Sequence, residues 1–157
     1  MDRTQVSSGE MQSSEQTSSL DSTYSTSDYF LTTILPRYVN RLYKELTEMN
    51  PHNAKTIRNY IDAEKVEINI KESTMADKIK KLCWLSRHLN HKSFTSITKQ
   101  DIVNYLDSIK KPESEDPSHR SIGTYNGIRI VLLKFFRWLY NPDEPDHRKR
   151  TTPPCMN

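Results

Sequence analysis

The stretch SIGTYNGIRIVLLKFFRWLY, residues Ser121–Tyr140, decides the fold of this 157-residue chain. Apolar side chains in its second half recur at helical spacing and occupy more than one side of the helix: Ile128, Val131, Leu132, Phe135, Phe136, Trp138 and Leu139. This apolar surface is wider than the stripe of roughly 100° that a surface helix buries. We therefore expect a central helix surrounded by other helices, with Ser121 as its N-cap and a polar first half.

Four preceding segments also have helical periodicity. The first expected helix is Leu35–Met49, with Pro36 tolerated in its first turn, and the second is Ala54–Lys65, capped by Asn53. The third is Thr74–Asn90, which begins with a Thr74–Asp77 capping box, and the fourth ends near Ile109. The last of these has the clearest start, because Thr98 and Asp101 have the spacing of a capping box. Ile97 and Ile102 flank this start at the two positions of a hydrophobic staple.

The predicted fold class is therefore all-α, a small bundle of four to five helices over residues 34–141. One segment, VEINIKES at residues 66–73, is ambiguous because Val66, Ile68 and Ile70 alternate as they would in a strand. The sequence predicts no second strand that could pair with this segment. We interpret this segment as the end of one helix followed by a loop.

Both ends of the chain are expected to lie outside the bundle. Residues 1–33 are predicted to be a disordered tail, because residues 1–28 contain 13 Ser or Thr and too few apolar side chains to offset the entropy of folding. Residues 142–157 contain four prolines and a basic run, which indicates a linker or tail.

The net charge is divided unevenly along the chain. Residues 1–28 carry one basic residue against five acidic ones, a net charge of −4, whereas the whole chain carries +3. Residues 29–157 therefore carry +7. A basic folded domain favours an anionic partner such as nucleic acid.

Several kinds of catalytic site are not indicated. None of the three glycines belongs to a GxGxxG or GxxxxGK[ST] array, which excludes the phosphate loops of nucleotide enzymes. His88 and His91 have no acidic or cysteine partner at helical spacing, so no metal and no cofactor are expected. Cys83 lies in a helical pattern typical of a packing residue, and no carboxylates are paired as an acid and a base. We expect no catalytic residue in this chain.

The composition also indicates a compartment. Cys83 and Cys155 do not form a disulfide framework and are expected to be reduced thiols. No apolar run approaches 18 residues, and the N-terminus lacks the apolar stretch of a signal peptide. We expect a soluble cytoplasmic protein without a membrane partner, associated with the nucleoid if it binds DNA.

A basic face is predicted on the Thr74–Asn90 helix. The side opposite its apolar stripe carries Lys80, Lys81, Trp84, Arg87 and His91. Lysine and arginine along one side of a helix can follow a phosphate backbone. The alternative is an ordinary solvated face.

The order of these elements resembles the N-terminal core-binding domain of tyrosine recombinases, the phage integrase family, and archaeal-type integrases in particular. Two motifs carry the resemblance, a short helix in ITKQDIVNYL and a final helix in SIGTYNGIRIVLLKFFRWLY. The matching residues are Ile97, Thr98, Asp101, Ile102, Tyr105 and Leu106, then Ser121, Thr124, Asn126, Leu132, Phe135, Phe136, Trp138 and Leu139. The resemblance covers about residues 54–140.

The resemblance implies a SAM-like helical bundle that forms one half of a clamp around double-stranded DNA. The residues it implies at the DNA are Ser73, Thr74, Lys78 and Lys81 near one helix and Ser121, Thr124, Asn126 and Arg129 near the other, to which the basic face adds Lys80 and Arg87. Lysine and arginine would neutralise phosphates, and Asn126 and Arg129 are the expected base readers.

A recombinase also needs a catalytic domain, of which this sequence has no counterpart after Tyr140. The resemblance therefore implies DNA binding for integration and recombination without catalysis by this chain, with a recombinase catalytic domain or other recombinase protomers as further partners. The main alternative is a helical protein-interaction module that docks a partner through Trp84 and the Leu35–Met49 helix. A helix-turn-helix regulator is disfavoured, because no two predicted helices are joined by the required turn of three or four residues.

Overall fold

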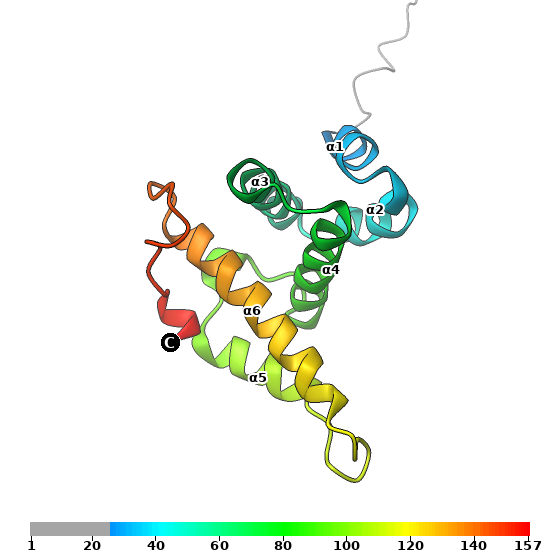
Figure 1. The fold of residues 1–157 in the computed structure, drawn as a ribbon, viewed down its shortest axis with the longest axis vertical. Helices are drawn as coiled ribbons and strands as arrows, with labels where there is room; N and C mark the ends of the chain where they lie inside the picture. Colours follow the sequence, from blue (N-terminus) through cyan, green and yellow to red (C-terminus); the bar gives the residue numbers. More distant parts are fainter. Residues whose placement is uncertain (1–25) are drawn as a thin grey trace, which may run out of the picture.

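The structure is a computed structural model, and it describes residues 26–157. Its α-helices are α1 (Thr26–Ile34), α2 (Val39–Thr47), α3 (Pro51–Ile68), α4 (Glu72–His88), α5 (Lys99–Ile109) and α6 (Arg120–Tyr140) (Figure 1). Three short 3-10 segments accompany them, η1 (Pro36–Tyr38), η2 (Phe94–Ser96) and η3 (Pro154–Met156). No strand occurs over residues 26–157, so the predicted all-α bundle is confirmed.

Helix α6 is the central element, as its apolar second half predicts. It packs against α3, α4 and α5, and it crosses in front of α5 in Figure 1. Phe135 is fully buried at the middle of the core. Its ring meets Tyr60 of α3 and Phe94 of η2 edge to face, with centroids 5.3 and 4.9 Å apart. Such aromatic pairs add about 0.5–1.5 kcal/mol each beyond the burial of their surface.

The start of α5 has the predicted capping box. The Thr98 hydroxyl accepts the backbone N–H of Asp101 at 3.3 Å, and the Asp101 carboxylate accepts the backbone N–H of Thr98 at 2.8 Å. Ile97 and Ile102, the expected staple residues, are both buried. The short sequence pattern was sufficient here because every partner lies within one helical turn.

Helix α3 begins earlier than predicted, and its cap is Asn50, not Asn53. The Asn50 side chain accepts the backbone N–H of His52 at 2.9 Å, and Pro51 occupies the first turn. Asn53 is instead fully buried and holds the loop after α4. Its amide donates to the carbonyl of Lys92 at 2.9 Å and accepts the N–H of Phe94 at 3.1 Å. The segment at 66–73 is a helix end and a loop, as expected.

Two other predicted caps are also wrong. Helix α4 begins at Glu72, so Thr74 lies inside its first turn and caps nothing. Helix α6 begins at Arg120, and its first amides are satisfied by Asp116, not by Ser121. The Asp116 carboxylate accepts the N–H of Ser121 at 2.6 Å and that of Arg120 at 3.1 Å. These hydrogen bonds lower the pKa of Asp116.

The N-terminal part of the bundle contains a helix that the sequence pattern did not reveal. Residues 26–34, expected to belong to a disordered tail, form α1, with Phe30 and Leu31 buried. The predicted tail over residues 1–25 lies outside the described residues. The expected helix Leu35–Met49 is divided, because Leu35 has an extended φ of −134° ahead of Pro36 and α2 begins only at Val39.

The C-terminal residues pack on the bundle, which differs from the expected linker over 142–157. Segment η3 lies against α5, with Cys155 buried. Arg150 is buried and forms a salt bridge with Glu67 at the end of α3, with N–O distances of 2.6 and 3.2 Å. The Arg137 guanidinium of α6 donates to the Thr152 hydroxyl at 2.6 Å. The folded part of the chain therefore extends well beyond Tyr140.

None of the helices within residues 26–157 combines the length and the apolar character needed to cross a membrane.

Candidate nucleic-acid interface

Helix α6 has an unusual charge pattern for its length. Its 21 residues include Arg120, Arg129, Lys134 and Arg137 and contain no Asp or Glu. Its N-terminal half stays exposed on one side, where Gly123, Thr124 and Asn126 reach the solvent. No carboxylate on this helix therefore opposes its exposed cations, Arg120, Arg129 and Lys134.

The exposed side of α6 also contains two glycines in the helix interior. A Cβ at Gly123 would have no neighbouring atom within 4 Å, and one at Gly127 would meet only the Lys81 ammonium, at 3.5 Å. Glycine in a helix costs about 0.5–1 kcal/mol relative to alanine. Packing inside this chain does not require either glycine.

Lys81 joins α4 to this surface. Its ammonium lies beside Gly127 and forms an ion pair with Asp77 one turn earlier on α4, at 2.6 Å. Thr124 is one helical turn before Gly127, about 60° around the axis, and is exposed. The structure therefore brings Lys81 and Thr124, predicted from two different helices, to one side of α6.

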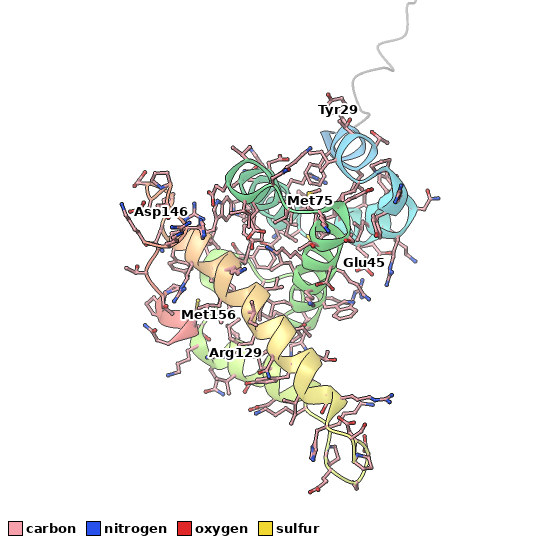
Figure 2. All side chains as sticks on the ribbon, viewed as in Figure 1. Tyr29, Glu45, Met75, Arg129, Asp146 and Met156 are labelled. Carbon is pink, nitrogen blue, oxygen red and sulfur yellow. The ribbon has the colours of Figure 1, made fainter. Side chains whose placement is uncertain are left out.

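The two expected base readers occupy another side of the helix. At about 100° per residue, Asn126 lies about 100° from Gly127 and Arg129 about 160° from it. Both are exposed, and Figure 2 shows Arg129 on the part of α6 that overlies α5. Asn126 and Arg129 are thus available to a ligand, but they do not converge with Lys81.

Lys78 is not part of any surface, so its predicted contact with DNA is wrong. Its side chain is 6% exposed and forms an ion pair with the buried carboxylate of Glu64. Burial lowers the pKa of Lys78, while the hydrogen bond and charge of Glu64 act in the opposite direction. The family resemblance implied Lys78 at the DNA, whereas its side chain turns toward α3 and pairs with Glu64.

Four other predicted residues lie on or near the remaining face of α4. Lys80 is half-buried with its ammonium 4.4 Å from the centre of the Trp84 ring, a cation–π contact. Ser73 and Thr74 are exposed in the first turn. Arg87 is exposed at the other end of the helix and pairs with Glu45 of α2. Arg87 therefore faces α2 and already has a carboxylate partner.

The structure adds basic residues that sequence reasoning missed. Arg41 of α2 lines a hollow together with Ser73 and Lys80. Lys110 and Lys111, which precede the polar loop before α6, line a second hollow of about 370 Å³ beside Ser121 and Asn126. The adjacent lysines Lys110 and Lys111 can be seen in the sequence, but their position beside Ser121 and Asn126 of α6 could not be predicted from it.

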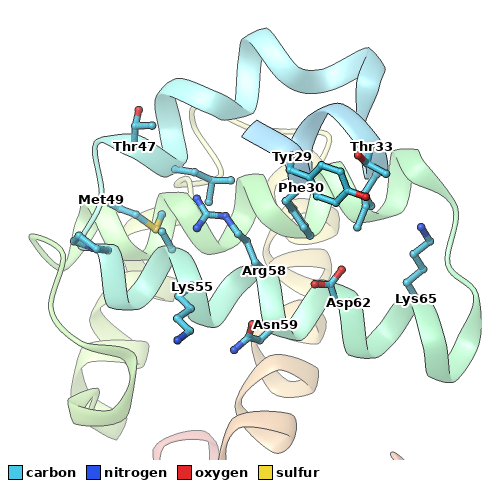
Figure 3. A pocket seen from close by; sticks show the side chains of 14 residues that line it. Tyr29, Phe30, Thr33, Thr47, Met49, Lys55, Arg58, Asn59, Asp62 and Lys65 are labelled. Atoms are coloured by element: carbon cyan, nitrogen blue, oxygen red, sulfur yellow. The ribbon is translucent and has the colours of Figure 1, made fainter. Parts of the chain in front are cut away.

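A groove of about 980 Å³ opens between α1, α2 and α3, away from α6 (Figure 3). Its floor contains Phe30, Leu46 and Met49, and Figure 3 shows Arg58 reaching between α2 and α3 and Asp62 and Lys65 on the α1 side of α3. This groove is larger than the hollow beside Ser73 and Lys80 and the one beside Ser121 and Asn126.

Nothing in the described residues forms a metal centre. No group of three or more His, Cys, Asp or Glu side chains is placed to hold a metal ion within residues 26–157. Cys83 and Cys155 are both buried free thiols. Burial raises the pKa of each, that of Cys83 to about 12.

No protein-family model, curated protein or solved structure matches this chain. The likeness to recombinase core-binding domains therefore depends on the two motifs quoted from the sequence.

Proposed function

We propose that this chain binds double-stranded DNA through α6 and the adjoining side of α4, as the core-binding half of a tyrosine site-specific recombinase. The observation that carries the proposal is the N-terminal half of α6, which has no carboxylate, exposes Arg120 and Arg129, and has the Lys81 ammonium of α4 beside it. Affinity for DNA comes mainly from cations that neutralise phosphates. A major groove admits an α-helix, and the exposed side of the N-terminal half of α6 is the part that would face it.

The exposed side chains suggest a division of roles. Lys81 and Thr124 lie beside the open backbone of Gly127, where a phosphate group can approach closely. Asn126 and Arg129 have the side chains that read adenine and guanine edges with paired hydrogen bonds. Lys111 adds charge at the same end of α6, beside Lys110, which forms an ion pair with Asp107 at 2.6 Å. In this arrangement the lysines position the protein and α6 reads the sequence.

The first test is the salt dependence of DNA binding. Fluorescence anisotropy of the full chain with a mixed-sequence duplex should show binding that weakens steeply with salt, with a slope equivalent to roughly 3–6 phosphate contacts. Binding that is absent at low salt overturns the proposal.

A matched pair of variants locates the surface. Arg129→Gln and Lys55→Gln each remove one exposed cation, the first from α6 and the second from the rim of the groove on α3. Only Arg129→Gln should weaken binding, by about tenfold or more at a cognate site, since a bidentate base contact contributes about 1–3 kcal/mol. Equal losses in the two variants would show that net charge alone, and not α6, governs binding.

The groove between α1, α2 and α3 favours the second candidate function, docking of a protein partner. Its apolar floor and its rim of Lys55, Arg58 and Lys65 against one carboxylate, Asp62, suit an acidic amphipathic helix. Tyr29, 74% exposed at the groove, distinguishes the two functions. If the chain binds DNA, Tyr29→Ser should leave that binding unchanged. If instead the chain binds no DNA, and Tyr29→Ser abolishes binding of a helical peptide, the chain is a protein-interaction module.

A further inference from the structure

A crevice of about 230 Å³ lies where the C-terminal segment folds against α3 and α6. It is lined by Glu64 and Glu67 from α3, by Lys134 and Arg137 from α6, and by His147, Arg148 and Arg150 from the C-terminal segment. Its volume is below the range of roughly 300–1,000 Å³ that is usual for drug-sized ligands. A small group of atoms, and not a large ligand, fits a space of this size.

Both carboxylates of the crevice already have a cation. Glu67 is held by the guanidinium of Arg150, which is 7% exposed, and Glu64 is held by the buried ammonium of Lys78. Each pair is internal to the fold and brings no net charge to the crevice. The two acidic residues therefore do not neutralise the other cations that line it.

Three further cations line the same crevice. Lys134 and Arg148 are exposed and have no carboxylate within ion-pair distance in residues 26–157. Arg137 is half-buried, and its recorded side-chain hydrogen bonds go to the neutral hydroxyl of Thr152. His147 lines the same space and would add charge when protonated. The crevice therefore has an excess of positive charge from two different segments.

Two hydrogen bonds hold the backbone turn that contains Arg148. The N–H of Arg148 donates to the Asp146 carboxylate at 3.0 Å, and the Arg150 guanidinium donates to the carbonyl of Glu144 at 3.0 Å. Asp146 and Glu144 are the nearest further acids in sequence, and neither lines the crevice. Asp146 is occupied by the turn, and its pKa is lowered chiefly by the N–H of Arg148.

We propose that this crevice is a binding site for a phosphoryl group, held by Lys134, Arg137 and Arg148. A tetrahedral oxyanion matches the planar donors of arginine and the point charge of lysine. The site depends on the folded C-terminal segment, and it is separate from the N-terminal half of α6 and independent of the proposed DNA contact there. The group is either a phosphate of a nucleic-acid backbone or that of a small phosphorylated molecule.

The test uses the full chain and inorganic phosphate at constant ionic strength. In ¹H–¹⁵N spectra, phosphate should produce saturable shifts of the Arg148 amide and the Arg137 Nε–H at millimolar concentrations. Arg148→Gln should weaken this binding by about tenfold or more, because it removes a charge-assisted hydrogen bond. Lys134→Gln should weaken it similarly.

Lys149→Gln is the matched control, because Lys149 is exposed, adjacent to Arg148 and outside the crevice. It should leave phosphate binding unchanged. Shifts that do not saturate, or an equal loss in Lys149→Gln and Arg148→Gln, would show only diffuse attraction of anions and overturn the proposal. Unchanged spectra of residues outside the crevice in each variant establish that the fold is intact.

A second titration, with a DNA duplex present, identifies the source of the phosphoryl group. Competition between duplex and phosphate for the Arg148 shifts assigns the site to a backbone phosphate. Simultaneous binding of both assigns it to a small phosphorylated molecule. Because the first titration contains no DNA, the phosphoryl site and the proposed DNA surface can fail independently.

Discussion

Lys78 of α4 and Glu64 of α3 form an ion pair inside the bundle, where only 6% and 7% of their side chains are exposed. The Tyr60 hydroxyl donates to the other carboxylate oxygen of Glu64 at 2.7 Å. Burial is the main cause that lowers the pKa of Lys78 and raises that of Tyr60. Each member of this trio is thus removed from water and depends on the other two.

Removing one partner of the ion pair should be costly. Glu64→Leu is expected to lower the free energy of unfolding by about 3–5 kcal/mol, because Lys78 is then buried without an anion. Urea unfolding followed by circular dichroism measures this change. Adding Lys78→Met to Glu64→Leu should recover much of the loss, and a double variant no more stable than Glu64→Leu would contradict the coupling.

The capping box of α5 should give the protein a specific sensitivity to acid. The Lys92 side chain and the backbone and hydroxyl of Thr98 lower the pKa of Asp101 from 3.8 to about 2. Because the folded pKa is below the unfolded one, the stabilisation is complete above the unfolded pKa and is lost as the pH falls from about 4 to about 2.

Melting temperatures of the protein and of Asp101→Asn over this pH range test the prediction. The variant should be less stable near neutral pH, and its disadvantage should shrink as the pH falls. Asp116 and Asp146 also have lowered pKa values, so both proteins should lose stability in acid. A difference between them that is independent of pH would exclude the assigned role of Asp101.

Gly123 separates stability from binding. Gly123→Ala should raise the free energy of unfolding by about 0.5–1 kcal/mol, since alanine favours the helix and its Cβ would meet no atom within 4 Å. If α6 is approached closely by DNA, the same variant should bind the duplex more weakly. A variant that is more stable and binds equally well would place the DNA away from this part of α6.

The two thiols should be inert while the protein is folded. Burial raises the pKa of Cys83 to about 12, Glu45 adds to this effect, and Arg87 partly opposes it. Since the thiolate is the reactive form, a thiol reagent at neutral pH should modify Cys83 only after unfolding. Rapid modification of Cys83 in the native protein, measured by the absorbance of the reagent, would contradict the burial of this side chain.

Local sequence signals predicted the helices well where a complete pattern lay within a few residues. The apolar surface of α6 and the capping box at Thr98 are of this kind, and both are confirmed. The errors at Asn53 and Ser121 have a different cause. Asn53 reaches the loop 39 positions later, and Ser121 is displaced as a cap by Asp116 from the preceding loop. Such partners become visible only when the chain is folded.

The candidate site was predictable in part, for the same reason. Helical spacing identified a basic side of α4 that contains Lys81, whereas Lys78 was expected at the DNA only from the family resemblance, which does not reveal which lysine is buried. One of these lysines lies against α3 and the other beside α6. Likewise, nothing near Arg148 in the sequence indicates that residues from α6 would line the same crevice.

The salt bridge between Arg150 and Glu67 joins residues 83 positions apart, and it changes how the bundle would carry mechanical load. Tension applied at the C-terminus reaches α3 through this bidentate pair and α6 through Arg137 and Thr152. Helices α3 and α6 therefore share the force before the C-terminal end of α6 is pulled directly. A pulling experiment should first detach η3 from α5 and then break this anchorage, and α6 should unwind from Tyr140 only after the C-terminal segment has come away.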